Sequence, residues 1–567
     1  PLGGYVKMFG QDDDPSHNAE QLQNSQVAAN SSEAVEKIGP NGEKYYIDRR
    51  SYLAKSVPQR MAIISAGVIM NVIFAFIFAT IAYAMGVKYV PSIVSETMPG
   101  SPAWQAGLEP GDEIIQLGDR MDPTFLQLMG GVTLGNLETG IPVTVRRAST
   151  DEVVPMTLKP TQVAGELAKV GISSPQSLKL YKEEPVVEGS AAAQAKLVSP
   201  AEGAAKKGDD KLLGGDVVVS VNGVAVENYR QYVGELAKGT GKPLVIGVQR
   251  PVKIEKGDAE AKAGDEVGET ESLTFEVPKQ PLRDLGLVME MGPITAVQAD
   301  SPADKAGVKS GDLIVAVDGK PIANPGEDPS GWTPLTLPEY LIQAALEGRE
   351  VEFQVRRGAT AKSEGEPHTI TIAPVTPIAI HSSTPIGAPV AADAVGIAYS
   401  IQNKVLAVKP SGPAASTQVA AGDTIVGARI TFPPNKKGKT VDPVEVALDA
   451  EHANWPAIID ALQFARAGTK VELQFKRGDN PEPMKVELEP QDADGMFIAS
   501  RGFVFEPITR VRQAATLSQA VSYGFEETTD SLMMVFRFLK KLGSQVPFKM
   551  LGGPGTIAVA AGDAASQ

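Results

Sequence analysis

One short pattern recurs four times along the chain, and this repeat constrains the fold more than any other feature of the sequence. Two copies align without a gap, SPAWQAGLEPGDEI from Ser101 to Ile114 and SPADKAGVKSGDLI from Ser301 to Ile314. A third copy, SGPAASTQVAAGDTI from Ser411 to Ile425, has one extra residue. The remaining copy is stretched, because SPAEGAA begins at Ser199 and GGDVV follows only at Gly214. The repeat predicts four similar small modules in tandem.

Each copy is followed by two short runs in which apolar and polar residues alternate. Alternation with a period of two predicts half-buried strands, and two such runs in succession predict an antiparallel pair. The pairs are VTVRRA with PMTLKP, LVIGVQRP with LTFEVP, VEFQVRRG with TITIAP, and VELQFKRG with MKVELEP. With 56 Gly, 43 Pro and 6% aromatic residues, the composition also favours a turn-rich chain. We therefore expect a β-rich (α+β) array.

A separate stretch from Met61 to Val87, MAIISAGVIMNVIFAFIFATIAYAMGV, carries no charge. The part that ends at Met85 would form a helix of roughly 37 Å, which exceeds a hydrocarbon core of about 30 Å. We expect a tilted transmembrane helix. Basic residues crowd its N-terminal flank, at Arg49, Arg50, Lys55 and Arg60. The positive-inside rule then places this flank in the cytoplasm and the modules outside.

Asn71 lies near the middle of this stretch and is its only carboxamide. An amide that faces lipid would leave donors and acceptors unpaired, so we expect it to face a partner helix or a polar cavity. One reading is a structural hydrogen bond between helices, worth about 0.6–2 kcal/mol. The other is a residue that lines a site between membrane helices, with Ala66 and Gly67 allowing close approach one turn earlier. The residues alone leave both readings open.

The net charge and the termini limit the remaining possibilities. A formal net charge of −15 argues against nucleic acid as a partner, because phosphate binding needs a basic surface. The chain has no cysteine, which excludes disulfides and thiol chemistry within it. It begins at Pro1 without an initiator methionine or a signal peptide and ends in GDAASQ. We interpret it as a piece of a longer protein.

The repeat, SPA-x3-AGL-x2-GD-x-I followed by a strand and V-[DN]-G, resembles the bacterial PDZ domain in the circularly permuted form found in envelope proteases. The resemblance implies a groove where an extended peptide adds as a strand, flanked by a strand that reads Φ-G-Φ and offers its amides to the peptide carboxylate. Four segments match that strand, VGIS, LGLVM, VGIAY and RGFVF, and we expect one in each module. The expected peptide-binding residues are Gly171, Ile172, Gly286, Leu287, Gly396, Ile397, Gly502 and Phe503. The alternative is a set of structural domains with blocked grooves.

PLGGYVKM at the start and YLAKSVPQRMAIISAGVIMN further on resemble the site-2 protease family, the RIP zinc metalloproteases. The matching residues are Pro1, Gly3, Gly4, Tyr5, Lys55, Ser56, Arg60, Ala66, Gly67 and Asn71. In that family a P-x-GG-Y-V loop dips into the membrane beside the active site, so the resemblance gives Gly3, Gly4, Tyr5 and Asn71 a substrate-positioning role. The chain departs at Val68, where the family has proline, which puts a helix bend there in doubt.

The resemblance implies a Zn²⁺ cofactor, bound by an H-E-x-x-H helix and by a later aspartate of an L-D-G motif. The chain carries neither motif. Its four histidines are His17, His368, His381 and His452, and none has a second histidine four residues away. We therefore expect no catalytic residue and no metal ligand in this chain, with the zinc ligands on segments before Pro1 and after Gln567.

Two functions remain. The first is an intramembrane zinc metalloprotease whose PDZ modules gate or sense membrane protein substrates and their peptide C-termini. The second is a non-catalytic, membrane-anchored PDZ scaffold that binds peptide C-termini. The loop and helix matches lie outside any PDZ module and favour the protease. Either protein would contact the lipid bilayer of the inner (cytoplasmic) membrane, with the modules on the extracytoplasmic side and no nucleic acid as partner.

The expected fold is mixed, with a membrane helix, tandem circularly permuted PDZ-like modules and a C-terminal amphipathic helix. The expected bounds are 1–10 for the membrane-associated loop, 11–56 for a polar cytoplasmic insertion, 57–87 for the membrane helix, 88–175, 176–290, 291–400 and 401–507 for modules 1 to 4, and 508–567 for the amphipathic helix and a G-P segment. In the last segment, Leu532, Val535, Phe536 and Leu539 share one helical face. Such a face suits a helix on a membrane surface, or one packed on the last module.

Overall fold

The computed structural model describes residues 25–543 except 39–41, 136, 163–166, 200–209, 240, 252–269, 323–331, 361–362, 382–383, 385, 435–437, 439, 449–454 and 479. The chain divides into two compact units. The first comprises residues 1–89 and 511–541, and the second comprises residues 90–510 and 542–567. The predicted loop residues Gly3, Gly4 and Tyr5 lie outside the described residues, as does the G-P segment.

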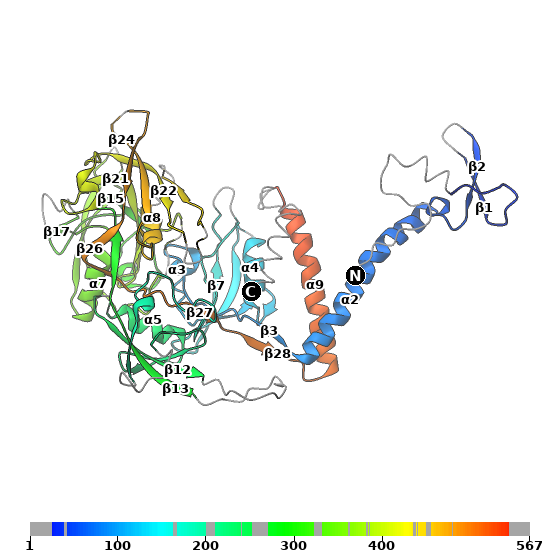
Figure 1. Cartoon of the computed structure of the whole chain (residues 1–567), viewed down its shortest axis with the longest axis horizontal. Helices are drawn as coiled ribbons and strands as arrows, with labels where there is room; N and C mark the ends of the chain where they lie inside the picture. Colours follow the sequence, from blue (N-terminus) through cyan, green and yellow to red (C-terminus); the bar gives the residue numbers. More distant parts are fainter. Residues whose placement is uncertain are drawn as a thin grey trace. The chain divides into compact units, whose positions relative to one another are not determined.

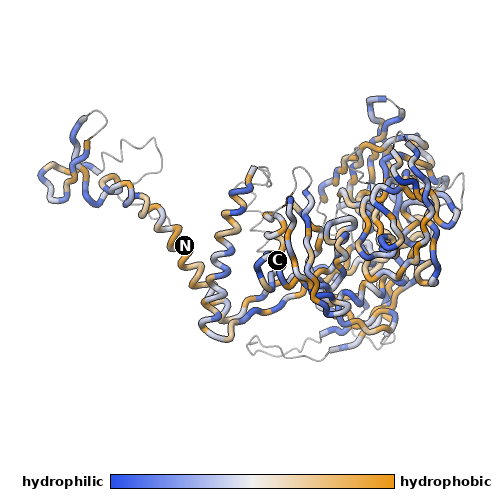
Figure 2. The backbone as a smooth tube through the Cα atoms, turned by 180° about the vertical axis from the view of Figure 1, so that it is seen from behind, coloured by the Kyte–Doolittle hydropathy of each residue, from blue (hydrophilic) through white to orange (hydrophobic). Residues whose placement is uncertain are grey.

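The first unit contains the long helix α2, Val57–Met85, which is drawn in blue in Figure 1. The Ser56 N–H donates to the side chain of Gln59 at 3.0 Å, which satisfies one donor at the start of the helix. Gly86 ends it with a φ of +102°. Among the described residues α2 is the one helix long and apolar enough to cross a membrane, and none of its residues is buried. Figure 2 shows hydrophobic residues along the length of this helix.

A second helix of this unit, α9 (Leu517–Lys541), fills the range where the sequence predicts a helix. Gly524 brings its backbone against α2, since a Cβ there would lie 2.3 Å from the Thr80 hydroxyl oxygen. The remaining elements are a hairpin within the expected insertion, β1 (Ala34–Ile38) and β2 (Lys44–Asp48), the turn η2 (Tyr52–Ala54), and the short strands β3 (Val87–Tyr89) and β28 (Arg510–Arg512).

The second unit repeats one order of elements four times: a helical turn, a strand with a short partner, a helix, and two further strands. Module 1 has α3 (Pro102–Gln105), β4 (Glu113–Leu117), β5 (Arg120–Met121), α4 (Phe125–Thr133), β6 (Ile141–Arg146) and β7 (Val153–Leu158). Module 2 has η3 (Ala192–Gln194), β10 (Val217–Val221), β11 (Val224–Ala225), α5 (Tyr229–Ala237), β12 (Leu244–Pro251) and β13 (Thr270–Val277). Module 3 has α6 (Pro302–Ala306), β16 (Leu313–Val317), β17 (Lys320–Pro321), α7 (Leu337–Leu346), β18 (Val351–Arg357) and β19 (Glu366–Ile372). Module 4 has η4 (Pro413–Ser416), β22 (Thr424–Thr431), β23 (Val444–Ala447), α8 (Trp455–Leu462), β24 (Lys470–Lys476) and β25 (Met484–Leu488).

The four strand pairs predicted from alternation are confirmed. β6 pairs with β7, β12 with β13, β18 with β19, and β24 with β25, all antiparallel. Each module buries the inward-facing residues of these strands in a core of its own, such as Val143 and Val145 in module 1 and Phe353 and Val355 in module 3. The alternation therefore predicted which side chains face inward.

The remaining strands connect the modules: β8 (Gln176–Leu180), β9 (Lys196–Ser199), β14 (Gln280–Asp284), β15 (Leu287–Val297), β20 (Val390–Ala392), β21 (Ile397–Val408), β26 (Gln491–Ile498) and β27 (Phe505–Pro507). β14 pairs with β26, and β27 pairs with β8 at the start of module 2. The chain thus leaves module 2 after β13 and returns to it only at β27. Modules 3 and 4 are an insertion within module 2.

The predicted bounds 176–290 and 401–507 are therefore wrong. Module 2 consists of residues 176–277 and 501–507, and module 4 consists of residues 280–291 and 402–498. Module 3, residues 292–401, shares two long strands with module 4. The first half of β15 pairs with the second half of β21 in module 4, and the other two halves pair in module 3.

Candidate functional site

The four glycines predicted to bind peptide lie in loops that share one backbone geometry. Each has a φ between +75° and +78°, a region that side chains other than glycine rarely adopt. Each also packs on a turn that opens a repeat copy, so that a Cβ would lie 2.2 to 2.7 Å from the nearest atom. These glycines are Gly171, Gly286, Gly396 and Gly502. Glycine is required at all four positions for both reasons.

Modules 1 and 3 use the glycine that follows them in sequence. Gly171 packs against Ser101, and the Ala103 N–H donates to the carbonyl before the glycine at 3.0 Å. Gly396 packs against Ser301 in the same way, and the Ala303 N–H donates at 2.9 Å. These two loops lie in the modules to which the sequence assigned them.

Modules 2 and 4 exchange the glycine loops that the sequence assigned to them. Gly286, expected in module 2, packs against Gly412 of module 4, and the Lys409 N–H donates to its carbonyl at 2.9 Å. Gly502, expected in module 4, packs against Ser190 of module 2, and the Val187 N–H donates to its carbonyl at 2.8 Å. The turn of module 2 is thus at Ser190, whereas Ser199, the predicted start of that copy, ends strand β9.

The residue after each glycine makes β-type backbone pairing, in a strand in modules 3 and 4 and in a single bridge in modules 1 and 2. Leu287 and Ile397 are the first residues of β15 and β21. Ile172 and Phe503 form isolated antiparallel bridges with Thr97 and Val186. The eight predicted peptide-binding residues therefore come together as four separate pairs, one per module.

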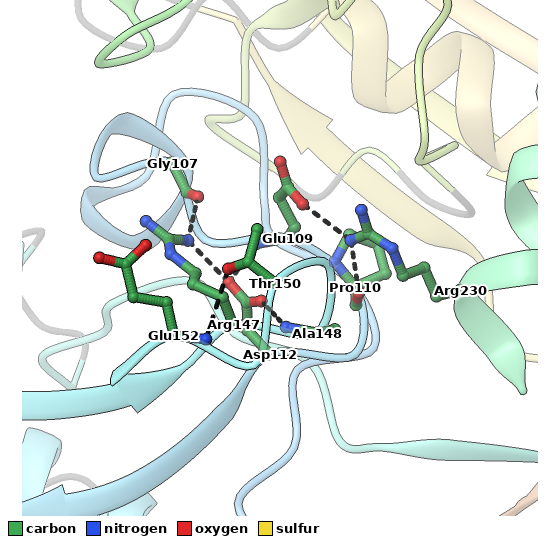
Figure 3. Close-up of polar contacts among 9 residues, drawn as sticks. All are labelled: Gly107, Glu109, Pro110, Asp112, Arg147, Ala148, Thr150, Glu152 and Arg230. Atoms are coloured by element: carbon green, nitrogen blue, oxygen red, sulfur yellow. Dashed lines mark hydrogen bonds and ion pairs between the residues drawn. The ribbon is translucent and has the colours of Figure 1, made fainter. Parts of the chain in front are cut away.

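A carboxylate–guanidinium clamp recurs in every module, and the sequence motifs did not reveal it. The aspartate of each G-D pair is at most 1% exposed and accepts hydrogen bonds from an arginine near the end of the next long strand. The pairs are Asp112–Arg147, Asp216–Arg250, Asp312–Arg357 and Asp423–Arg477. Figure 3 shows the first, in which Arg147 also donates to the Gly107 carbonyl. Each clamp fixes its turn to the sheet.

The clamp of module 4 lowers the pKa of its aspartate, and the turn held by the clamp of module 1 contacts module 2. In module 4, the hydrogen bonds from Arg477 hold the pKa of Asp423 below its ordinary value. In module 1, the same turn meets module 2, because Arg230 donates to the Glu109 carboxylate at 2.8 Å (Figure 3). The recurrent signal in sequence is an arginine at the end of the first strand of each pair, and all four motifs VTVRRA, LVIGVQRP, VEFQVRRG and VELQFKRG contain it.

A buried ion pair joins modules 1 and 3. The His381 Nε2 lies 2.8 Å from an oxygen of Asp393, and its Nδ1 lies 3.8 Å from Glu96 of module 1. The indole N–H of Trp104, also in module 1, donates to Asp393 at 3.2 Å. Burial opposes the imidazolium, but the two carboxylates outweigh this effect and raise the pKa of His381 to about 9.

This pair is expected to give the chain a pH-dependent stability. The folded-state pKa of His381 lies above its ordinary value of 6.5. The stabilisation is therefore complete below about pH 6.5 and is lost as the pH rises through about 9. Thermal unfolding of wild type and His381→Gln at pH 6 and pH 10 checks this. The stability difference between the two should narrow by on the order of 2 kcal/mol at the higher pH. An equal stability difference at pH 6 and pH 10 would show that the pKa of His381 is not raised by folding.

The predicted membrane residue Asn71 lies on α2 with an exposed side chain. Among the described residues it has no hydrogen-bond partner. The helix contact at Thr80 and Gly524 lies nine positions further along, about 13.5 Å at 1.5 Å per residue. Within the described part of the chain no partner group meets Asn71, and its predicted role stays a prediction.

The described residues do not fit a zinc ion. No group of three or more histidine, aspartate or glutamate side chains in the described part of the chain could hold a metal. The buried His381 and Asp393 pair with each other, and Asp393 also accepts a hydrogen bond from the indole of Trp104.

Comparison with known proteins points to one family. The family model described as Peptidase family M50 matches residues 1–567. Protease RseP of Yersinia pestis is 28% identical over 306 residues, 52% of this chain and 58% of that protein. A candidate zinc metalloprotease of Vibrio cholerae serotype O1 is 29% identical over 254 residues, 44% of this chain and 48% of that protein. The chain thus spans about half the length of these curated relatives, 58% of the first and 48% of the second. A solved PDZ domain protein from Parabacteroides distasonis overlaps 74% of this chain at a TM-score of 0.13 and 11% identity, a likeness too small to indicate a shared fold.

Proposed function

The chain belongs to peptidase family M50, and we propose that it is the central portion of an intramembrane zinc metalloendopeptidase. The single observation that carries this proposal is the family match, which runs over residues 1–567 rather than over the repeated modules alone. The exposed apolar helix α2 supports it, because a span of this length suits a bilayer. The substrates in this proposal are membrane-anchored proteins.

The four modules act in this proposal as circularly permuted PDZ domains that gate or sense the substrate. Their support is the loop glycine with its positive φ, which recurs in all four and is followed by a residue that pairs in a strand in modules 3 and 4 and in a single β-bridge in modules 1 and 2. Backbone amides next to such a glycine can receive a peptide carboxylate or a peptide strand. The residues that would do so are Gly171, Ile172, Gly286, Leu287, Gly396, Ile397, Gly502 and Phe503.

The proposed location is the inner membrane, with the modules on its extracytoplasmic side. The basic residues before α2 favour this orientation. Helix α9 would lie at the membrane surface, because Val535, Phe536 and Leu539 are each more than half exposed on it. The cofactor Zn²⁺ is proposed only for the whole protein, with ligands outside this chain, since the described residues offer no set of ligands. Gly3, Gly4 and Tyr5 would position the substrate.

The test of this function uses Asn71 in the full-length parent protein. If Asn71 lines the reaction site, Asn71→Leu should insert well, because it removes a polar group from lipid, and cleavage of a membrane substrate should fall at least 10-fold per folded molecule. Asn71→Gln should keep part of the activity, since the amide survives. Ile69→Leu on the same helix is the matched control and should cleave normally.

The outcomes separate this function from its alternative. Full specific activity in Asn71→Leu would reduce Asn71 to a packing residue. Absence of cleavage by the wild-type parent protein, with peptide binding retained, would leave the membrane-anchored PDZ scaffold as the function.

A further inference from the structure

A short strand of module 3 occupies the edge where a peptide would add. β20 (Val390–Ala392) pairs antiparallel with Ile397–Tyr399, the first residues of β21 after the loop glycine Gly396. The same residues of β21 pair with β15 on their other edge. β20 therefore takes the one edge of this strand that remained for an incoming chain.

The position of β20 matches that of a peptide in a strand-addition groove. β20 contacts helix α7 as well as β21, so it lies between the strand and the helix of module 3. Ala392 is fully buried, and Val390 packs against the apolar core of the module. Backbone pairing on one side and small apolar side chains toward the core are the two features of peptide recognition by strand addition.

Module 1 covers this strand from outside. Trp104, which is 1% exposed, packs with Ala296 of β15 and Ala398 of β21 in a separate apolar cluster, and Ala391 of β20 packs against that cluster. Trp104 is absent from the core cluster of its own module. Its main packing role is therefore at the interface with module 3, where it lies over β20 and β21.

Further contacts hold the segment before β20 against modules 1 and 2. Ile380 packs on the apolar core of module 2. His381 forms the buried pair with Asp393 and approaches Glu96 of module 1. Pro389 touches module 1 at Gly100, where a Cβ would lie 2.8 Å from the proline ring. These contacts tie β20 to the docking of modules 1 and 2 on module 3.

We propose that β20 is a built-in strand ligand that closes the peptide groove of module 3, and that Trp104 of module 1 holds it there. The groove accepts an extended chain of small apolar residues, of the kind that Val390, Ala391 and Ala392 supply. Withdrawal of module 1 frees β20 and opens the groove to a substrate segment of the same chemistry. This inference rests on the proposed function of the modules as peptide-binding domains.

The test measures peptide binding to the full chain in detergent micelles. The probe is a fluorescein-labelled peptide GAPVAA, the sequence of residues 387–392, and the readout is fluorescence anisotropy. Trp104→Ala is expected to tighten binding at least 10-fold, because the apparent affinity rises with the fraction of open groove. An amidated peptide tests whether a free carboxylate adds to the affinity.

A disulfide lock provides the matched control. Ala391 and Ala398 lie directly opposite each other, and the chain has no other cysteine to interfere. In Trp104→Ala combined with Ala391→Cys and Ala398→Cys, oxidation should abolish the gain in binding and reduction should restore it. Equal binding in the oxidised and reduced forms would overturn the proposal.

Hydrogen exchange in β20 and at Ile397–Tyr399 reports whether the strand has left. If Trp104→Ala exposes these amides and the peptide still does not bind, this edge is not a peptide site. If the amides stay protected, Trp104 does not hold the strand. Either result overturns the proposal. No readout involves proteolysis, so a failure here leaves the proposed protease function standing, and loss of cleavage in the Asn71 test leaves this groove unaffected.

Discussion

A chain in which residues 285–490 are replaced by Asn-Gly is expected to keep modules 1 and 2 folded. The reason is the pairing of β14 with β26, in which Asp284 lies directly opposite Gln491. Residues opposite each other in antiparallel strands have Cα atoms about 4.5–5.5 Å apart, and a two-residue turn closes such a pair. The deletion removes modules 3 and 4 while β27 can still reach β8.

A much shorter deletion is expected to do more damage. Removing residues 501–507 takes away the loop of Gly502 and strand β27, which complete module 2 although they follow it by more than two hundred positions. Hydrogen exchange in β10 and β12 measures the fold of module 2 in both variants. Protection should survive the long deletion and be lost in the short one. The reverse result would restore the sequential bounds that the sequence suggested.

The contrast between local and distant pairing explains how far the sequence could predict this fold. Alternation of apolar residues predicted β6 with β7 and the three equivalent pairs, because both strands of each pair carry their own pattern. The partner of a glycine loop depends instead on which sheet its strand joins. LGLVM and RGFVF carry the same chemistry, so only their order along the chain could assign them to modules. The insertion of modules 3 and 4 within module 2 makes that assignment wrong. Ser190 was missed for a related reason, because SPAEGAA at Ser199 matches the repeat better.

The candidate site divides in the same way. A positive φ at the loop glycines follows from the motif, and the structure shows it at all four. Closure of module 3 by β20 could not be predicted, since Val390–Ala392 has no motif and acts through its neighbours. The aspartate–arginine clamps were predictable in part. Both residues recur in every copy, but they are separated by 34 to 54 positions in sequence, which hides the pairing.

The clamps of modules 2 and 4 offer a matched test of burial. Arg250 and Arg477 make the same bonds, each donating from Nε and Nη2 to one aspartate, at 2.7 and 2.8 Å for Arg250 and at 2.8 Å for both bonds of Arg477. The side chain of Arg250 is 10% exposed, whereas that of Arg477 is 51% exposed. Water can therefore replace the guanidinium of Arg477 far more readily than that of Arg250.

Arg250→Met is expected to lower the free energy of unfolding of module 2 by about 3–5 kcal/mol, because it leaves the buried carboxylate of Asp216 without its counter-charge. Arg477→Met should lower the free energy of unfolding of module 4 much less, since an exposed partner contributes little. Native-state hydrogen exchange in β12 and β24 measures each module separately. The double variant Asp216→Asn with Arg250→Met should recover part of the loss, because no buried charge then remains. Equal costs for the two arginines would show that the exposure of the guanidinium does not set the strength of the clamp.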